Sequence, residues 1–555
     1  MIQFISVIVL FFIIIFFLIN KYYEGKNNKF QKENTVDNFC NKYYKAIWVI
    51  LSIIIFITVI YKFGEIPYYI GVDEAGMIYD ANNLAEYGTD RYMNSYPLYL
   101  TNFGSGQSSL CAYLVTFCIK LFGANIISYR LPTLIIYLMS VIVSYLLISK
   151  AKNKKTALLF TFLIITCPWN IWNARMALDC NLYAGLFMLD LYLLDKAKKS
   201  YQYLIAGISI GVTLYTYCLS WITMPFFLLG WSIYMFYIKR LKIKQLVILG
   251  IPIAIFAMPL IYFILLNYGI VNQTKIGIFT LPVLQSFGAS SINIVNWFRY
   301  GGESIKTIFL SSGTIYLIYI PLFIIGYILE IKQAIQEIKN KQYGISSIIV
   351  IAFTTLFLGL LSTLIPTPNK ANVLYIPILY FVTSAIIYIS RNSKIILTIF
   401  LATILVLLID YEYYYYTYRG TIGANYYEDI YLTSITRKIE NDENAKKLQK
   451  YVLTFKCSPY IYNLIEANIS PEEYMNTVQE KDYNSVKLVS KVGNYNYIYF
   501  EEEIKELKIE DTSDYIFIIR YDYKDAIKYI EEKDYKCIRY GSYYILCRDT
   551  SWMDD

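Results

Sequence analysis

Residues 71–81 read Gly71-Val-Asp73-Glu74-Ala-Gly-Met-Ile-Tyr-Asp80-Ala, and three motifs follow before residue 133: Tyr87-Gly88-Thr-Asp90-Arg91, Asn102-Phe-Gly104-Ser-Gly106-Gln107 and Tyr129-Arg130-Leu131-Pro132. This acidic segment, which contains several glycines, begins shortly after an apolar run at 46–63. A polar, acidic segment directly after a span departs from the apolar composition of the rest of the chain, and such loops often carry function. Residues 71–132 are therefore the first candidates for a functional site.

The composition limits the kinds of protein that this chain can be. The chain has 555 residues, of which 57% are hydrophobic, and a mean hydropathy of +0.42, which indicates many membrane spans. It contains no histidine, so acid–base chemistry must rest on Asp, Glu, Lys, Tyr or Cys. The nine cysteines form no CxxC pair, which argues against a zinc site or redox motif. The net charge of +8 is spread over short loops and does not indicate nucleic-acid binding.

Apolar runs suitable for spans predict an α-helical polytopic membrane protein with about twelve spans. They lie near 2–19, 46–63, 126–148, 156–170, 182–195, 202–218, 220–238, 246–266, 307–329, 345–365, 371–390 and 394–411. The first is interpreted as a retained anchor, because its lysines follow the apolar run instead of preceding it.

The basic loops predict the orientation of these spans. They are 20–45, 150–155, 196–199, 239–244, 332–341 and 391–394, and all six fall on one side if the spans alternate. The positive-inside rule places that side in the cytoplasm. The loops 64–125 and 267–306 and everything after residue 411 are then expected outside a plasma membrane.

One apolar stretch, 109–122, is too short to span a bilayer. Ser109, Thr116 and Lys120 share one of its faces at helical spacing, which favours an interfacial helix on the outer membrane surface.

The tail has a different pattern from the rest of the chain. Strand-like runs occur at 451–455, 497–500 and 514–519, a helical stretch at 524–532 and a hairpin at 535–546 around Gly541. This pattern predicts a small extracytoplasmic α/β domain without a recognisable catalytic motif. The predicted organisation is an anchor and linker at 1–45, a transmembrane domain at 46–411 and the α/β domain at 412–555.

Asp73 and Glu74 stand about ten residues beyond the 46–63 span, before a stretch of helical spacing that ends at Gly88. The structural interpretation is that Asp73 caps this helix. The functional interpretation is that its carboxylate accepts a proton from an incoming hydroxyl or amine. The two roles are compatible, because a helix start also fixes the position of the carboxylate.

Four basic residues lie on the predicted outer side, against the positive-inside bias: Arg130, Arg175, Arg299 and Lys370. Each one alone is explained as well by a structural role, snorkelling or pairing with Asp179 or Glu303, as by anion binding. Together they indicate a cationic site for an anion, for which a lipid-linked phosphate is the natural candidate.

These residues resemble the GT-C glycosyltransferases that use polyprenyl-phosphate sugars, such as the protein O-mannosyltransferases and the aminoarabinose transferase of lipid A. The matching features are the Asp-Glu after the first core span, Tyr96-Pro97 ahead of Gly106-Gln107, a helix ending in Leu-Phe-Gly123, and Arg130-Leu131-Pro132. Residues 175–181 resemble the family's second outer loop. Residues 366–377 resemble its late outer loop, where Asn369-Lys370 stands in place of the usual Asn-Arg.

The resemblance implies an inverting transfer of a sugar to a lipid, glycan or protein acceptor. Asp73 would be the general base, with Glu74 beside it in the catalytic site. Lys370, Arg130, Arg175 and Arg299 would bind the donor phosphate, and the supporting or sugar-binding residues would be Asp80, Gln107, Asp179, Asn181 and Asn369. Some relatives use a divalent metal and others do not. Asp73, Glu74 and Asp179 offer oxygen ligands suited to Mg²⁺ or Mn²⁺, and the metal is left open.

Two other classes of function remain as alternatives. A secondary transporter would have inverted repeats and charges near the middle of the membrane, whereas here no repeat is apparent and the charges lie at span ends. A non-enzymatic scaffold for export or assembly of cell-envelope polysaccharide would use the α/β domain and leave Asp73 as a helix cap.

Overall fold

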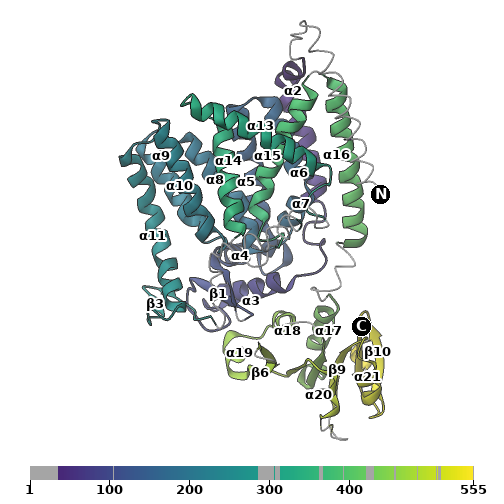
Figure 1. The fold of residues 1–555 in the computed structure, drawn as a ribbon. Coiled ribbons are helices and arrows are strands. Elements are labelled where there is room, and N and C mark those ends of the chain that lie inside the picture. The colour runs from purple at the N-terminus through teal and green to yellow at the C-terminus, as the bar shows by residue number, and fades with distance from the viewer. Residues whose placement is uncertain are drawn as a thin grey trace. The chain divides into compact units, whose positions relative to one another are not determined.

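The computed structural model of the chain describes residues 10, 35–103, 105–284, 306, 313–361, 367–391, 393–419, 430–454, 458–483, 486–507, 509 and 514–553 (Figure 1). The expected anchor span at 2–19 lies almost entirely outside these residues. The chain forms two compact units. A helical unit comprises 1–64, 130–265 and 287–416, and a mixed unit comprises 65–129, 266–286 and 417–555.

The helical unit is a bundle of helices, many of them connected by short loops. In the described residues these are α2 (Thr35–Ile55), α5 (Ile126–Ala151), α6 (Lys154–Thr166), α7 (Pro168–Ala174), α8 (Asp179–Lys196), α9 (Ser200–Thr213), α10 (Ser220–Tyr237), α11 (Ile243–Asn267), α13 (Tyr319–Lys339), α14 (Ile345–Leu361), α15 (Asn372–Ser390) and α16 (Lys394–Tyr414). The helix expected at 307–329 instead begins at Tyr319 and continues to Lys339, so most of the basic segment 332–341 is helical rather than a loop. The reason is that this segment consists mainly of good helix formers.

Five of the described helices are long and apolar enough to cross a membrane, and the pair α6 and α7, bent by 65°, makes a sixth if it counts as one span. The total of about twelve spans is therefore not established. The helices α2 and α11 are mostly exposed. In the apolar 18-residue stretch of each, only 22% is buried within the structure. Ile251, Ile255 and Met258 form part of the exposed apolar face of α11, at the spacing of one helix face. Such a face suits a lipid environment.

The helix α15 lies at the centre of the helical unit and packs against α13. In its apolar 18-residue stretch, 78% is buried within the structure. Gly326 on α13 lies directly against the backbone of Phe381 on α15, and a β-carbon at position 326 would overlap the Phe381 carbonyl. The close approach of the two helices therefore depends on the absence of a side chain at this position.

Gly326→Ala is expected to destabilise the protein by about 1–3 kcal/mol, because the atom that blocks the new methyl group is backbone and cannot change rotamer. Gly250→Ala is the matched control, since a β-carbon there meets no atom within 4 Å. Thermal unfolding in detergent should separate the two variants. Equal midpoints would mean that α13 and α15 are free to move apart.

The mixed unit is built on a seven-stranded sheet with the order β10-β11-β9-β5-β8-β7-β6. The strands are β5 (Gln449–Leu453), β6 (Gln479–Tyr483), β7 (Val486–Val492), β8 (Tyr495–Ile498), β9 (Tyr515–Arg520), β10 (Lys536–Tyr540) and β11 (Tyr543–Cys547). The central strand β5 pairs in parallel with β8 and β9, and the outer pairs are antiparallel. Two short hairpins complete the described strands: β1 (Tyr99–Asn102) with β2 (Ser105–Ser108), and β3 (Lys275–Ile276) with β4 (Phe279–Thr280).

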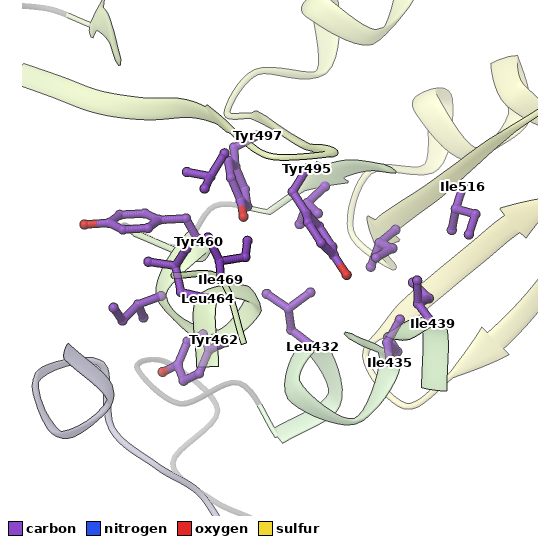
Figure 2. Close-up of a cluster of buried hydrophobic side chains, with 14 of the residues drawn as sticks. Leu432, Ile435, Ile439, Tyr460, Tyr462, Leu464, Ile469, Tyr495, Tyr497 and Ile516 are labelled. Carbon is purple, nitrogen blue, oxygen red and sulfur yellow. The ribbon is translucent and has the colours of Figure 1, made fainter. Parts of the chain in front are cut away.

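Alternation along the strands gives the sheet two apolar faces. On β9, Ile516 and Ile518 belong to one cluster, and Phe517 and Ile519 to the other, as a period of two requires. The second face is covered by α20 (Glu501–Lys505) and α21 (Lys524–Glu531). The first is covered by α17 (Ile430–Asn441), α18 (Tyr460–Glu466) and α19 (Pro471–Thr477), and Figure 2 shows tyrosine and aliphatic side chains of this cluster.

The predicted secondary structure of the tail is confirmed. The three strand-like runs are β5, β8 and β9, the helical stretch is α21, and the hairpin consists of β10 and β11 with Gly541 at a φ of +60° in its turn. One feature was not expected from the sequence. The first cluster also contains Ala75 and Tyr79, so the segment after the 46–63 span shares a core with the tail.

Candidate functional site

Asp73 and Glu74 lie in the first turn of α3 (Val72–Glu86), in the mixed unit. The expected cap is wrong in detail, because Gly71 is the N-cap residue and Asp73 is already the second helical residue. Gly88 follows the helix with a φ of +74°, and its amide donates to the Asn83 carbonyl, as expected of a helix end. The Glu74 side chain is buried, whereas the Asp73 side chain is exposed. Of the two carboxylates, Asp73 is the one that a substrate can reach.

The surroundings of Asp73 change the pKa of its carboxyl. Partial desolvation by the surrounding protein raises the pKa of its carboxyl above the ordinary value. A general base works best when its pKa approaches the working pH, so an upward shift makes Asp73 a stronger proton acceptor than a fully hydrated aspartate. Asp73 also lies in the first helical turn, where the helix dipole stabilises a negative charge.

Several contacts from outside α3 hold this helix in place along its length. The Gln107 side-chain amide on β2 donates to the Asp73 carbonyl at 3.1 Å. Thr116 on α4 (Ser109–Phe122) donates to the Ala81 carbonyl, and the Tyr79 hydroxyl donates to the Ile469 carbonyl at 2.6 Å. The Gln107 side chain therefore contacts the backbone of Asp73 and positions this residue. The helix expected at 109–122 is present, with Thr116 buried against α3.

Asp80 is part of a buried ion pair beneath the same helix. Arg91 Nε and Nη2 donate to the two Asp80 oxygens at 2.9 and 2.8 Å, and Arg91 Nη2 also donates to the Gly76 carbonyl. Both side chains are essentially inaccessible, with exposed fractions of 0% and 1%. In this arrangement Asp80 supports α3 and has no access to a substrate.

The predicted cations have different surroundings in the helical unit. Arg175, fully buried, donates to the Thr58, Tyr61 and Lys62 carbonyls and to the Tyr416 hydroxyl at 2.8–3.0 Å. These carbonyls lie in and after the π-helical turn Phe56–Ile60 that follows α2, where the backbone hydrogen bonds of the helix end. Arg175 therefore caps the end of this helix. Arg130 is also fully buried, in the first turns of α5. Arg299 lies outside the described residues.

Lys370 precedes α15 in a turn that also contains Asn369, and its side chain is half-buried. Within the part of the chain that the structure describes, it has no carboxylate partner. Burial lowers the pKa of the Lys370 ammonium. A phosphate beside it would compensate this cost, which makes Lys370 the best placed of the three described cations to bind an anion.

A network of asparagines joins the two segments predicted as the second and late outer loops. Asn173 donates to Asn372 at 2.7 Å, and Asn372 donates to Asn181, which in turn donates to the Asn173 and Met176 carbonyls. Asp179, at the start of α8, accepts from the Cys180 amide. The sequence placed Asn181 in this site but gave no role to Asn173 or Asn372.

Beside this network lies a polar cavity of about 20 Å³, enough for one water molecule. Asn173 Oδ1 and the Tyr137 hydroxyl line it, and both lack a hydrogen-bond partner among the described residues. Glu412 on α16 is buried with both carboxylate oxygens unpartnered in the described part of the chain, and Arg175 is the opposite charge near it. Sequence reasoning did not find Glu412, because one acidic residue near the end of an apolar run gives no distinct signal.

The metal ligands considered from the sequence are Asp73, Glu74 and Asp179. Over the described residues, no three Asp, Glu, Cys or His side chains are grouped closely enough to hold a metal ion. The choice of metal therefore stays open.

No family model and no curated protein sequence matches the chain. Among solved structures, it is similar to ArnT, an aminoarabinose transferase, from Cupriavidus metallidurans bound to undecaprenyl phosphate, with 10% identity and a TM-score of 0.52 over 92% of this chain and 99% of that one. The apo form of the same protein gives 11% identity, a TM-score of 0.51 and the same coverage. The archaeal oligosaccharyltransferase AglB from Archaeoglobus fulgidus, in complex with an inhibitory peptide and a dolichol-phosphate, gives 13% identity and a TM-score of 0.47 over 92% of this chain and 75% of that one. The chain has the GT-C fold.

Proposed function

We propose that this protein is a membrane glycosyltransferase that moves a sugar from a polyprenyl-phosphate donor to an acceptor, with inversion, and that Asp73 is its general base. The observation that carries the proposal is the exposed Asp73 carboxylate with a raised pKa at the fixed start of α3, in a chain with the GT-C fold. Binding of undecaprenyl phosphate by ArnT supports the choice of donor. Because polyprenyl phosphate leaves as a stable anion, the reaction needs a base for the acceptor but no protein acid.

The test is turnover by the purified protein in detergent. Polyprenyl-phosphate hexoses and pentoses are offered with lipid, glycan and peptide acceptors, and release of free polyprenyl phosphate is measured. Release that requires both an acceptor and protein is expected for at least one pair. If the folded protein binds such donors but releases no polyprenyl phosphate with any acceptor, the transferase assignment fails and a transporter or scaffold remains.

Charge distribution supports an orientation in which the 150–155 loop is cytoplasmic and the sheet of the mixed unit is outside the plasma membrane. In a Cys218→Ser background, a membrane-impermeant maleimide on intact cells should label Glu532→Cys and leave Ala151→Cys unlabelled. Both native side chains are exposed, so reactivity reports the side of the membrane. The reverse pattern would contradict the orientation.

Lys370→Gln is expected to weaken donor binding by roughly 1.5–3 kcal/mol, the range for a charge-assisted hydrogen bond. Lys275→Gln removes an equal charge from an exposed position and serves as control. Binding is measured with a non-hydrolysable polyprenyl-phosphate sugar. Equal affinities of the two variants would exclude Lys370 and move the phosphate to Arg130, the next candidate.

A further inference from the structure

Four of the basic segments of the helical unit meet at one cavity of about 480 Å³. It is lined by the loop between α5 and α6, the ends of α8, α10 and α13, and the connection to α14. The sequence placed all of these segments on the same side of the membrane from charge alone, and the structure brings them together in one end of the bundle. None of the lining residues belongs to the proposed transferase site.

The cavity contains more positive charge than its carboxylates can balance. Its lining includes four cations, Lys150, Lys152, Lys198 and Arg240, against two acids, Asp195 and Glu337. Both acids already have partners. Asp195 accepts from the Tyr343 hydroxyl at 2.5 Å, and Glu337 accepts from the Ser347 amide and hydroxyl at 2.9 and 2.7 Å.

Arg240 is held in a defined position. Its guanidinium lies 3.7 Å from the centre of the Tyr343 ring, and that ring is anchored through its hydroxyl to the buried Asp195. A guanidinium stacked on an aromatic ring keeps its N–H groups free at the edge of the plane. Among the described residues Arg240 has no ion pair or side-chain hydrogen bond, so these donors are available to a ligand.

The lysines around the cavity complete the arrangement. Lys152 donates to Ser346 at 3.0 Å and lies 3.7 Å from Glu330, which fixes its ammonium at the wall. Lys150 and Lys198 are exposed, and neither has an ion pair within the described part of the chain. The Arg240 guanidinium, the fixed Lys152 ammonium and two exposed ammonium groups therefore border the same space.

We propose that this cavity is a binding site for a phosphate group, separate from the donor site. A guanidinium fork matches two phosphate oxygens, and the lysines neutralise the remaining charge. The same chemistry comes from an anionic phospholipid headgroup at the membrane surface or from a free phosphate anion. The space of about 480 Å³ is larger than a phosphate ion needs and accommodates a headgroup.

The experiment uses the full-length protein in zwitterionic detergent. One arm measures binding of phosphatidylglycerol, with phosphatidylcholine as the uncharged comparison, by native mass spectrometry. The other arm titrates inorganic phosphate by calorimetry. Saturable phosphatidylglycerol binding that millimolar phosphate does not displace identifies a lipid site, whereas phosphate binding that excludes the lipid identifies a free-anion site. Absence of both overturns the proposal.

Three variants test whether the cavity itself is responsible. Arg240→Gln is expected to weaken binding at least tenfold, and Arg240→Lys, which keeps the charge but loses the fork and the stack, is expected to weaken it several-fold. Lys242→Gln is the matched control, because Lys242 is exposed in the same loop and does not line the cavity. Lys198→Gln removes an exposed cavity lysine without touching the packed wall, so it provides a second reading if Arg240 variants fold poorly.

Equal losses in Lys242→Gln and Lys198→Gln would mean that the basic loops attract anions diffusely and that no site exists. Full binding by Arg240→Lys and Arg240→Gln would have the same meaning. Sugar transfer from a polyprenyl-phosphate donor is measured in parallel, and it should be unchanged in Lys198→Gln. Failure of the phosphate site would therefore not imply failure of the transferase function, and the reverse also holds.

Discussion

Asp73→Asn should lower sugar transfer by about 10²–10⁴, the range for loss of a general base, while the protein stays folded and binds donor. Asparagine has the same size and keeps the second position of α3, and Gly71 rather than Asp73 is the N-cap residue, so the helix start loses no cap. The change removes only the proton acceptor and one charge that favours the helix N-terminus. If Asp73 has only a structural role, the Asp73→Asn variant should therefore transfer sugar at nearly the parental rate.

The pH dependence of kcat/KM provides a second test of Asp73. A change in stability alone would not alter this dependence in the same way. A base must be deprotonated to act, so kcat/KM should rise with pH through the raised pKa of Asp73 and then level off. Asp73→Asn should lose this acid limb. Glu86→Gln removes an exposed carboxylate from the far end of α3 and should keep both rate and limb. If Asp73→Asn transfers sugar at the parental rate, Asp73 has no catalytic role.

Arg91→Met is expected to destabilise the mixed unit by about 3–5 kcal/mol, the largest stability change that we predict. Methionine fills much of the space but leaves the Asp80 carboxylate buried without its partner, at an exposed fraction of 1%. It also removes the donor to the Gly76 carbonyl. The free energy of unfolding is measured by chemical denaturation in detergent, followed by circular dichroism.

The chain provides a matched pair at the surface. Arg437 makes the same two-bond contact with Glu466, both bonds at 2.8 Å, but its side chain is 63% exposed. Arg437→Met should therefore cost less than 1 kcal/mol. The double variant Arg91→Met with Asp80→Leu should recover most of the stability, because no buried charge remains. Equal losses from Arg91→Met and Arg437→Met would mean that burial of the first pair is not maintained in solution.

Sequence reasoning predicted best where one local rule decides the structure. Alternation of apolar residues located β5 and β9, and glycine located the turn at Gly541 and the end of α3 at Gly88. It was less accurate where helical propensity continues past the apolar run, as in α13, because hydropathy marks the lipid-embedded part and not the helix end.

The site could be predicted only as a set of candidate residues. The placement of Asp73 at a helix start follows from local sequence, but the partners of Arg175 lie more than 110 residues away at carbonyls 58, 61 and 62. Backbone carbonyls leave no mark in a sequence, so a cation bound to them looks the same as one available to a substrate. Likewise, Asn173 and Asn372 are 199 residues apart, and nothing local to either one indicates the other.

The shared core of α3 and the sheet has a consequence for how the chain can be divided. Ala75 and Tyr79 are buried in the cluster built mostly by residues 432–552, and Tyr79 bonds across 390 residues to Ile469. A chain ending at residue 416 would leave one side of the Asp73 helix uncovered, even though every span was intact. Residues 417–555 therefore cannot be replaced by those of a relative without affecting α3. A substitution deep in the sheet can change how Asp73 is presented, and residues 65–129 and 417–555 should be inherited or transplanted together.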